Sequence, residues 1–345
     1  MTEQATTRKV GSLIGYDKER EKIAALIEQD EPAVPRHLAI IGDPLSGKTT
    51  VAGELLQRYG DHIHSLSLDR VIVRETLPDF SATGKEWVLV DNCEYLATRQ
   101  IGGFDLLDEF LRAHLTSGKR FITIWNSHAW RYLNAVRDIG TYYPEVITLP
   151  AMDPETIRQL VRSRYQQQEI RFIDEAPKEP EKIFTLVDHK ITLPFSKKEH
   201  IVPFLHLNTS VLRARLRARN AAETSPEDEI FKKLHRVAGG NPGVAMDVFA
   251  GCLDEGSISL QKVPEDDCAL SLDITESFIL ALILSANTLH YQDLSAMVWS
   301  RANFDRALYR LLQQGLILER CGSYRVSPVH MVCVTKYLKK NQRLW

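Results

Sequence analysis

The stretch GDPLSGKTT, residues 42–50, matches the pattern G-x-x-x-x-G-K-[ST] and decides the fold. It follows the apolar run HLAII at residues 37–41 and precedes the helical pattern VAGELLQRYG at residues 51–60. In a strand, loop and helix of this kind, the glycines let the main chain wrap closely around phosphate oxygens. The N–H groups of the loop and of the helix N-terminus supply positive potential. The stretch therefore predicts a phosphate-binding loop.

Side chains of the same loop carry the chemistry that a nucleotide needs. Lys48 is expected to reach the β- and γ-phosphates, and the hydroxyl of Thr49 is expected to ligate Mg²⁺. The other loop residues expected to contact the nucleotide are Gly42, Pro44, Ser46, Gly47 and Thr50. The predicted ligands are therefore ATP or ADP together with Mg²⁺.

A carboxylate at the end of a neighbouring strand would complete the magnesium site. The stretch VLVDNCEYL provides Asp91 directly after four apolar residues, and we expect Asp91 to hold Mg²⁺ through water. Glu94 follows three residues later. Either Glu94 polarises the water that attacks the γ-phosphate, or it is a solvated residue at the start of the next element.

Apolar segments and helical patterns alternate between residues 36 and 150. The expected strands are 37–41, 63–68, 87–91, 120–125 and 145–150, and the expected helices are 49–59, 104–115 and 128–139. The strands are apolar enough to be buried on both faces, and the alternation favours a parallel sheet with helices on both sides. We therefore predict an α/β nucleotide-binding core over residues 36–150.

Helical patterns dominate after this core. Asp153 is a good N-cap and Pro154 suits the first helical position, so a helical lid is expected over residues 151–267. Within it, a proline-containing stretch near residues 170–210 favours an insertion, with an extended hairpin as one possible form. The acidic, turn-rich residues 255–267 are typical of a linker.

The segment 268–345 contains three helical patterns followed by two short strands around a Cys-Gly-Ser turn. This order predicts a C-terminal winged helix-turn-helix. Its third helix offers Asn303, Arg306 and Arg310 to DNA, but Asp305 dilutes the basic character of that helix. We therefore favour a protein-docking role for this segment, with DNA contact as the alternative.

The motifs GYDKEREKIAAL, GDPLSGKTT, VLVDNCEYL, ITIWNSHAW and VAGGNPGVA occur in the order that resembles the AAA+ superfamily of P-loop ATPases. The resemblance covers residues 11–255 and is greatest to the STAND branch and related archaeal-type ATPases. It implies that Tyr16, within an N-terminal lead over residues 1–35, lies beside the adenine. It also implies that Asn126 is a polar sensor of the γ-phosphate or attacking water, and that Pro242 of the lid approaches the nucleotide.

Two departures from the pattern of this family concern hydrolysis. Most AAA+ enzymes have Asp-Glu at the strand end, whereas Asn92 follows Asp91 here, and the lid motif GGNPGVA contains no arginine. The resemblance therefore implies nucleotide binding with slow hydrolysis. Arg131 and Arg137 follow Asn126 at positions where an arginine finger can occur, or they are plain surface arginines.

Composition and charge limit the setting in which the protein acts. Forty-three basic and forty-five acidic residues leave a net charge of −2, so contact with nucleic acid would need a local basic patch.

The five cysteines form no CxxC pair and are expected to be reduced thiols. The first residues lack an apolar leader, and the longest apolar run, residues 278–284, is too short to span a bilayer. We expect a cytoplasmic protein.

Taken together, these patterns predict a nucleotide-controlled regulatory or assembly switch that acts on protein partners and hydrolyses ATP slowly. Nucleotide-dependent oligomerisation would be compatible with this role. One alternative is a DNA-binding loader resembling origin-recognition initiators or transposon-associated ATPases. A third is a degenerate nucleotide-binding scaffold without turnover.

Overall fold

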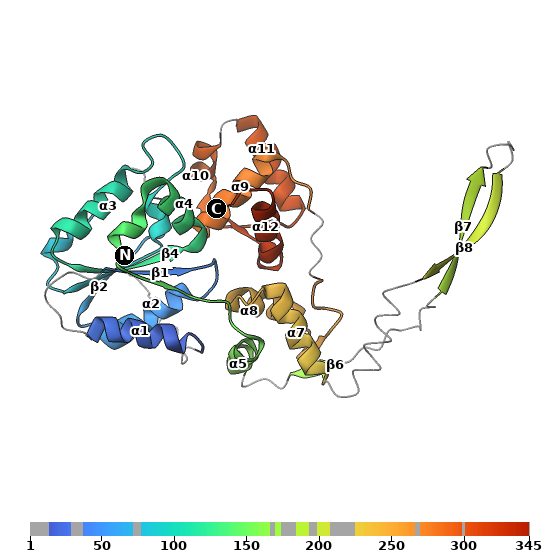
Figure 1. Ribbon diagram of the computed structural model, residues 1–345, viewed down its shortest axis with the longest axis horizontal. Coiled ribbons are helices and arrows are strands. Elements are labelled where there is room, and N and C mark those ends of the chain that lie inside the picture. Colours follow the sequence, from blue (N-terminus) through green and yellow to red (C-terminus); the bar gives the residue numbers. More distant parts are fainter. Residues whose placement is uncertain are drawn as a thin grey trace.

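The computed structural model describes residues 14–28, 37–71, 77–165, 170–173, 184–192, 199–207, 225–265, 270–298 and 301–344. Figure 1 shows a body that contains the α/β core, the lid helices and the C-terminal elements, with a β-hairpin projecting away from it. Most of the N-terminal lead and much of the predicted insertion fall outside the described residues.

A five-stranded parallel sheet forms the core, with strand order β2-β3-β4-β1-β5. The strands are β1 (Leu38–Gly42), β2 (Ile63–Ser67), β3 (Trp87–Asp91), β4 (Arg120–Asn126) and β5 (Glu145–Thr148). Each begins and ends within two residues of its expected position, so the predicted α/β fold class is confirmed. The register pairs Gly42 with Asn126, which brings the carboxyl ends of β1 and β4 to the same edge.

Helices cover both faces of this sheet (Figure 1). Helices α1 (Asp17–Glu28) and α2 (Lys48–Tyr59) lie on one face, and α3 (Asp105–Thr116) and α4 (Ser127–Arg137) lie on the other. Short 3-10 turns occur at η1 (Phe80–Ala82), η2 (Cys93–Leu96) and η3 (Ile139–Tyr142). Because β1 leads directly into the loop before α2, the phosphate loop lies at the edge where parallel α/β sheets usually bind ligands.

In the described part of the lid there are three helices: α5 (Pro154–Arg164), α7 (Pro226–Ala238) and α8 (Pro242–Cys252). Strand β6 (Arg171–Ile173) pairs in parallel with β9 (Ser257–Ser259). The prediction of a linker over residues 255–267 is therefore wrong for β9, since its main chain is hydrogen-bonded to a strand of the lid. Within the predicted insertion, β7 (Phe184–Thr192) and β8 (Glu199–Leu207) form an antiparallel hairpin.

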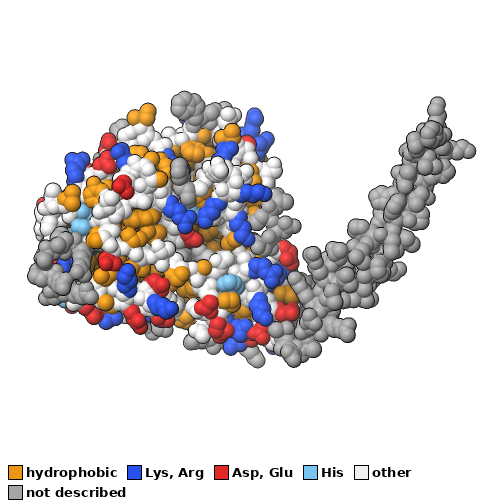
Figure 2. Space-filling view, viewed as in Figure 1, with side chains coloured by type: hydrophobic (Ala, Val, Ile, Leu, Met, Phe, Trp, Pro, Cys, Tyr) orange, Lys and Arg blue, Asp and Glu red, His pale blue; other side chains and the backbone are white. Residues whose placement is uncertain are grey.

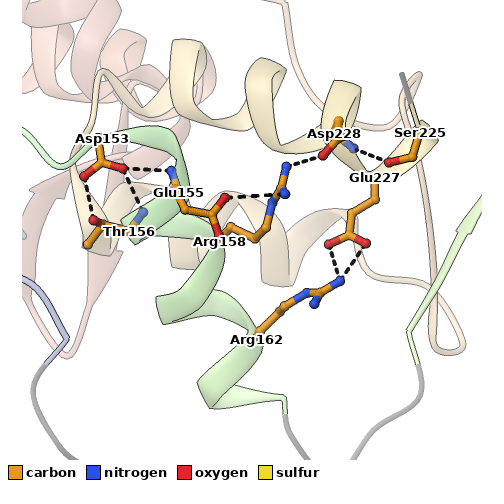
Figure 3. Close-up of polar contacts among 8 residues, drawn as sticks. All are labelled: Asp153, Glu155, Thr156, Arg158, Arg162, Ser225, Glu227 and Asp228. Atoms are coloured by element: carbon orange, nitrogen blue, oxygen red, sulfur yellow. Dashed lines mark hydrogen bonds and ion pairs between the residues drawn. The ribbon is translucent and has the colours of Figure 1, made fainter. Parts of the chain in front are cut away.

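Ion pairs join α5 to α7, as Figure 3 shows. The Arg158 guanidinium lies 2.5 Å from Asp228, and Arg162 donates to both carboxylate oxygens of Glu227 at 2.6 and 2.7 Å. The predicted N-cap Asp153 accepts hydrogen bonds from the first turn of α5. The two helices therefore have matched charges along their contact.

The C-terminal unit, residues 270–298 and 301–344, contains the helices and the short strands that the sequence predicts. Its elements are α9 (Ile274–Ala286), β10 (Leu289–His290), α10 (Tyr291–Met297), α11 (Arg301–Gln313), β11 (Ile317–Arg320), β12 (Ser323–Val326) and α12 (Pro328–Lys340). The strands form a sheet of order β10-β12-β11, and neither β10 nor the helix α12 was among the predicted elements. Helix α9 packs against α4 and η2 of the core, and α12 packs against α7 and α8 of the lid.

The redox state of the cysteines agrees only in part with the prediction of reduced thiols. Cys93, Cys252 and Cys321 are free thiols, but Cys333 is disulfide-bonded, so the prediction of reduced thiols is wrong at Cys333. Cys268 lies outside the described residues. Among the described helices, none is long and apolar enough to cross a membrane.

Candidate nucleotide-binding site

The phosphate loop adopts a tight, partly left-handed conformation. Leu45 and Gly47 have φ angles of 62° and 92°. A Cβ atom on Gly42 would lie 2.4 Å from Ser46 Oγ, so a side chain at this position would displace Ser46. Ser46 Oγ is itself buried and has no hydrogen-bond partner within the described chain. A loop with an unpartnered hydroxyl, followed by the free N–H groups of a helix N-terminus, fits a phosphate group.

Lys48 is buried at the first position of α2, where its ammonium group lies among acceptors. Its Nζ donates to the main-chain oxygens of Gly42 at 3.0 Å and Asp43 at 2.8 Å. Burial lowers the pKa of Lys48, while the charges of Glu94 and Asp91 oppose that shift. Since phosphate oxygens would supply stronger partners than two carbonyl groups, Lys48 is suited to bind them.

Asp91 and Thr49 lie together, as the proposed magnesium site requires. The Asp91 carboxyl is buried at the end of β3, and burial raises its pKa while a hydrogen bond with the Thr49 side chain lowers it. The Asn92 N–H donates to Asp91 Oδ1 at 2.8 Å. A hydroxyl beside a carboxylate provides the hard oxygen ligands that Mg²⁺ prefers. These residues therefore fit the ion.

A cavity of about 590 Å³ opens beside the phosphate loop. Its lining residues are Ile14, Tyr16, Leu45, Ser46, Gly47, Lys48, Thr49, Thr50, Asn92, Met152, Leu160, Pro242, Gly243, Met246 and Asn287. The predicted contact residues Tyr16, Ser46, Gly47, Lys48, Thr49, Thr50 and Pro242 are thus brought together, whereas Gly42 and Pro44 are not in the lining. The lining combines apolar side chains from the N-terminal segment and the lid with polar residues of the loop. Such a mixed lining suits a ligand with an apolar base and charged phosphates.

Tyr16 closes the cavity on the side of the N-terminal segment. Its hydroxyl donates to the main-chain oxygen of Ser46 at 2.8 Å, and burial raises its pKa. Gly15 before it has a φ angle of 88°, and a Cβ there would lie 2.9 Å from Met152 Cε. The segment predicted to lie beside the adenine is therefore fixed both to the phosphate loop and to the start of the lid.

The lid reaches the phosphate loop through the first turn of α8. Asn241 caps this helix, and its Nδ2 donates to the main-chain oxygen of Pro44 at 2.7 Å. The Gly243 N–H donates to the main-chain oxygen of Leu45 at 3.0 Å. The lid motif therefore contacts the loop directly, beside Pro242 in the cavity wall.

Glu94 is buried, and both its carboxylate oxygens accept hydrogen bonds. Oε2 accepts from the Asn126 N–H at 3.1 Å, and Oε1 accepts from Asn287 Nδ2 of the C-terminal unit. Burial raises the pKa of Glu94 to about 7, although the nearby Lys48 charge opposes the shift. Glu94 does not line the large cavity; it lines a separate one of about 40 Å³ between the core and α9. The solvated alternative is excluded, since Glu94 is only 4% exposed.

Asn126, the predicted sensor, is fully buried at the end of β4. Its Oδ1 accepts the His128 N–H at 2.9 Å and so caps α4. Its Nδ2 donates to the main-chain oxygen of Leu284 at 2.7 Å and to Asn287 Oδ1 at 2.9 Å. The side chain of Asn126 therefore contacts the C-terminal unit and does not line the large cavity.

Asn287 was not among the site residues predicted from the sequence. It follows α9 and contacts both Glu94 and Asn126, and it also lines the large cavity. An asparagine after a helix is an ordinary C-cap, so the sequence carried no signal of this role.

The candidate arginine fingers have different surroundings. Arg137 lies 3.7 Å from Asp108 and stacks over the Phe104 ring at 4.6 Å, so it is paired within the chain. Arg131 is exposed, and its charge lowers the pKa of Asp43 in the phosphate loop. Burial acts on Asp43 in the opposite direction, and a hydrogen bond from Ser127 adds to the lowering.

Comparisons with known proteins reveal a distant likeness. No protein-family model matches the sequence, and no curated protein matches it. Among solved structures, a variant of Thermotoga maritima RuvB is 14% identical with a TM-score of 0.42, and 95% of each chain is covered. Cdc6p from Pyrobaculum aerophilum is 12% identical with a TM-score of 0.42, covering 97% of each chain. The Aeropyrum pernix ORC2 protein, in ADPNP-ADP complexes, is 12% identical with a TM-score of 0.41 and 94% coverage of each chain.

At these identities and TM-scores the likeness assigns no substrate or partner to this chain. The phosphate loop, the parallel sheet and the helical lid are nevertheless all present in the described residues. They agree with the architecture that the AAA+ resemblance implies.

Proposed function

We propose that this protein binds ATP with Mg²⁺ and hydrolyses it slowly, as a nucleotide-controlled switch that acts on protein partners. The observation that carries the proposal is the composition of the large cavity. Its wall combines the phosphate loop, Tyr16, the lid residue Pro242 and Asn287 of the C-terminal unit. A ligand in this cavity would therefore contact every part that has to respond to it.

Binding follows from the side chains of the site. Lys48 would pair with the β- and γ-phosphates, and the first turn of α2 would supply N–H donors. Thr49 and Asp91 would hold Mg²⁺, which neutralises phosphate charge when bound. The apolar residues Met152, Leu160 and Met246 would surround the base. This arrangement favours a nucleoside triphosphate over a smaller anion.

Hydrolysis requires a water oxygen to form a bond to the γ-phosphorus while the bond to the β,γ-bridging oxygen breaks. The products are ADP, phosphate and a proton. In this proposal Glu94 would orient the water and accept its proton, whereas the amide of Asn92 could only orient it. Both oxygens of Glu94 already accept hydrogen bonds from other residues, which supports slow turnover.

The nucleotide state would reach the rest of the molecule through two contacts of the C-terminal unit. Helix α12 packs against the lid helices α7 and α8, while α9 packs against α4 and η2. A shift of the lid relative to the core on binding of the γ-phosphate would therefore move the contacts of α12 relative to those of α9. We take this unit to be a winged helix whose exposed surface binds a protein partner.

A DNA-binding ATPase is the second candidate, because Lys and Arg side chains gather over the C-terminal unit in Figure 2. The contacts of α11 favour the protein partner. Arg310 lies 3.7 Å from Glu276 and 3.8 Å from Asp273, and Tyr291 holds Asp305 at 2.7 Å. The candidate recognition helix is thus partly neutralised within its own unit.

Phosphate release and hydrogen exchange together test the proposal. Wild-type protein with Mg²⁺ and ATP should release phosphate slowly, and Glu94→Gln should bind ATP with little release, while Asn92→Ala retains more of the rate. Mg²⁺ with a non-hydrolysable ATP analogue should change the hydrogen exchange of α9 and α12. A protein that binds ATP with no change in either helix would contradict the switch.

A further inference from the structure

Asn287 has a main-chain conformation that an L-residue rarely adopts. Its φ and ψ angles are 60° and −53°, and the Thr288 N–H donates across it to the Ala286 oxygen at 2.6 Å. This is a γ-turn of the strained kind. Such conformations cost free energy and persist where surrounding contacts hold them, often at functional sites.

Contacts with the core hold this turn from both sides. Tyr95 Oη donates to the Thr288 main-chain oxygen at 3.0 Å, and Asn126 Nδ2 donates to the Leu284 oxygen at 2.7 Å. Arg99 donates to Ser285 Oγ at 3.2 Å on the neighbouring turn of α9. The end of α9 is therefore placed by the residues that follow β3 and β4, where the predicted catalytic groups lie.

The strained turn aims the Asn287 side chain at those groups. Asn287 Nδ2 donates to Glu94 Oε1, and Asn287 Oδ1 accepts from Asn126 Nδ2 at 2.9 Å. With the Asn126 N–H on Glu94 Oε2, three hydrogen bonds close a partly buried network between the core and the C-terminal unit. The network leaves neither the carboxylate of Glu94 nor the amide of Asn126 directed at the large cavity.

We propose that Asn287 is a positioning residue by which the docked C-terminal unit restrains ATP hydrolysis. Its amide holds the Glu94 carboxylate in place, so Glu94 cannot orient the attacking water or accept its proton until the end of α9 moves. This inference rests on the proposed ATPase function and identifies the residue that sets its rate. It also gives a reason for the strain, since a relaxed C-cap would not direct the amide to Glu94.

The test uses the full chain and the variant Asn287→Gly. Glycine adopts a positive φ readily, so the turn is retained while the amide is lost. Freed from a hydrogen bond to a charged group, Glu94 should raise kcat roughly tenfold. The KM for ATP should change less than kcat, because the phosphate loop is untouched. The same substitution in a Glu94→Gln background should leave the rate unchanged.

Ser285→Ala is the matched control. It removes the hydrogen bond with Arg99 at the same interface but retains the Asn287 amide and the contacts of Tyr95 and Asn126 that hold the turn. Its kcat should therefore stay close to that of the wild type. A kcat for Asn287→Gly equal to or below the wild-type value would overturn the inference. An equal increase in Ser285→Ala would overturn it as well, because docking in general would then set the rate.

Calorimetric titration with ATP distinguishes a failure of the proposed function from a failure of this inference alone. A wild-type chain that does not bind ATP overturns the proposed function and this inference with it. ATP binding with unchanged turnover in Asn287→Gly overturns this inference alone.

Discussion

The side-chain amide of Asn126 lies 2.7 Å from the main-chain oxygen of Leu284, a residue 158 positions later in the chain. The contact joins the end of β4, where the register places Asn126 opposite Gly42 of the phosphate loop, to the last turn of α9. A displacement of the end of α9 would therefore break the buried hydrogen bond between Asn126 and Leu284. This bond lies at the end of β4, the strand next to β1, which leads into the phosphate loop. In the low-dielectric interior, leaving such a group without a partner is costly.

Hydrolysis should depend on pH through Glu94. Burial raises the pKa of its carboxyl to about 7, and only the ionised form can accept a proton from water. The single-turnover rate should therefore rise with pH and reach half its maximum near pH 7. Glu94→Gln should be slow and should lack this rise. A wild-type rate that is flat between pH 6 and 8 would exclude Glu94 as the base.

The same carboxyl should make stability fall as pH rises. The pKa of Glu94 is raised in the folded chain, so the folded state binds more protons than the unfolded state between the two pKa values. Its contribution is fully present below the unfolded pKa and is lost as pH rises through about 7. The free energy of unfolding from urea titrations should therefore decrease less with pH in Glu94→Gln than in the wild type. Equal slopes in the two proteins would count against a raised pKa of the buried Glu94.

Contact between the lid and the phosphate loop should control nucleotide affinity. A Cβ atom on Gly243 would lie 2.5 Å from the Leu45 main-chain oxygen and 2.7 Å from Leu45 Cβ. Gly243→Ala should therefore push α8 away from the loop and weaken ATP binding, measured by calorimetry.

Gly251→Ala provides the control on the same helix, since a Cβ there meets nothing within 4 Å. It should leave ATP affinity unchanged and stabilise the fold by up to about 1 kcal/mol through helix propensity. Loss of affinity in both variants would mean that α8 responds to any substitution. Unchanged affinity in Gly243→Ala would show that closure of the lid on Leu45 does not matter for binding.

Duplex DNA should bind weakly to this protein. Arg306 is exposed on α11, whereas Arg310 lies near Asp273 and Glu276 of its own unit. Binding to a random duplex, followed by fluorescence anisotropy, should fall steeply with salt and be marginal at physiological salt. Submicromolar binding there, abolished by Arg306→Glu with Arg310→Glu, would favour the DNA-loader alternative.

The core was predictable because its signals are local. Each apolar strand, and the phosphate loop of residues 42–50, can be recognised from a pattern of ten residues or fewer. The five strands of the sheet lie where these patterns predict them. The contact between Glu94 and Asn287 joins residues 193 positions apart, and no local pattern encodes it. Strand β9 was missed for the same reason, since three residues become a strand only by pairing with β6.

Calorimetric titration of Mg²⁺ and ATP into the wild type and Lys48→Met tests the central claim most directly. Methionine keeps an unbranched side chain in the buried site and removes the charge. Lys85→Met is the control, because Lys85 Nζ also donates to two main-chain oxygens, those of Gly60 and Asp61 at 2.8 and 2.6 Å. We predict that the wild type and Lys85→Met bind ATP alike, and that Lys48→Met does not bind measurably. Equal affinity in all three proteins would contradict the assignment of the nucleotide site.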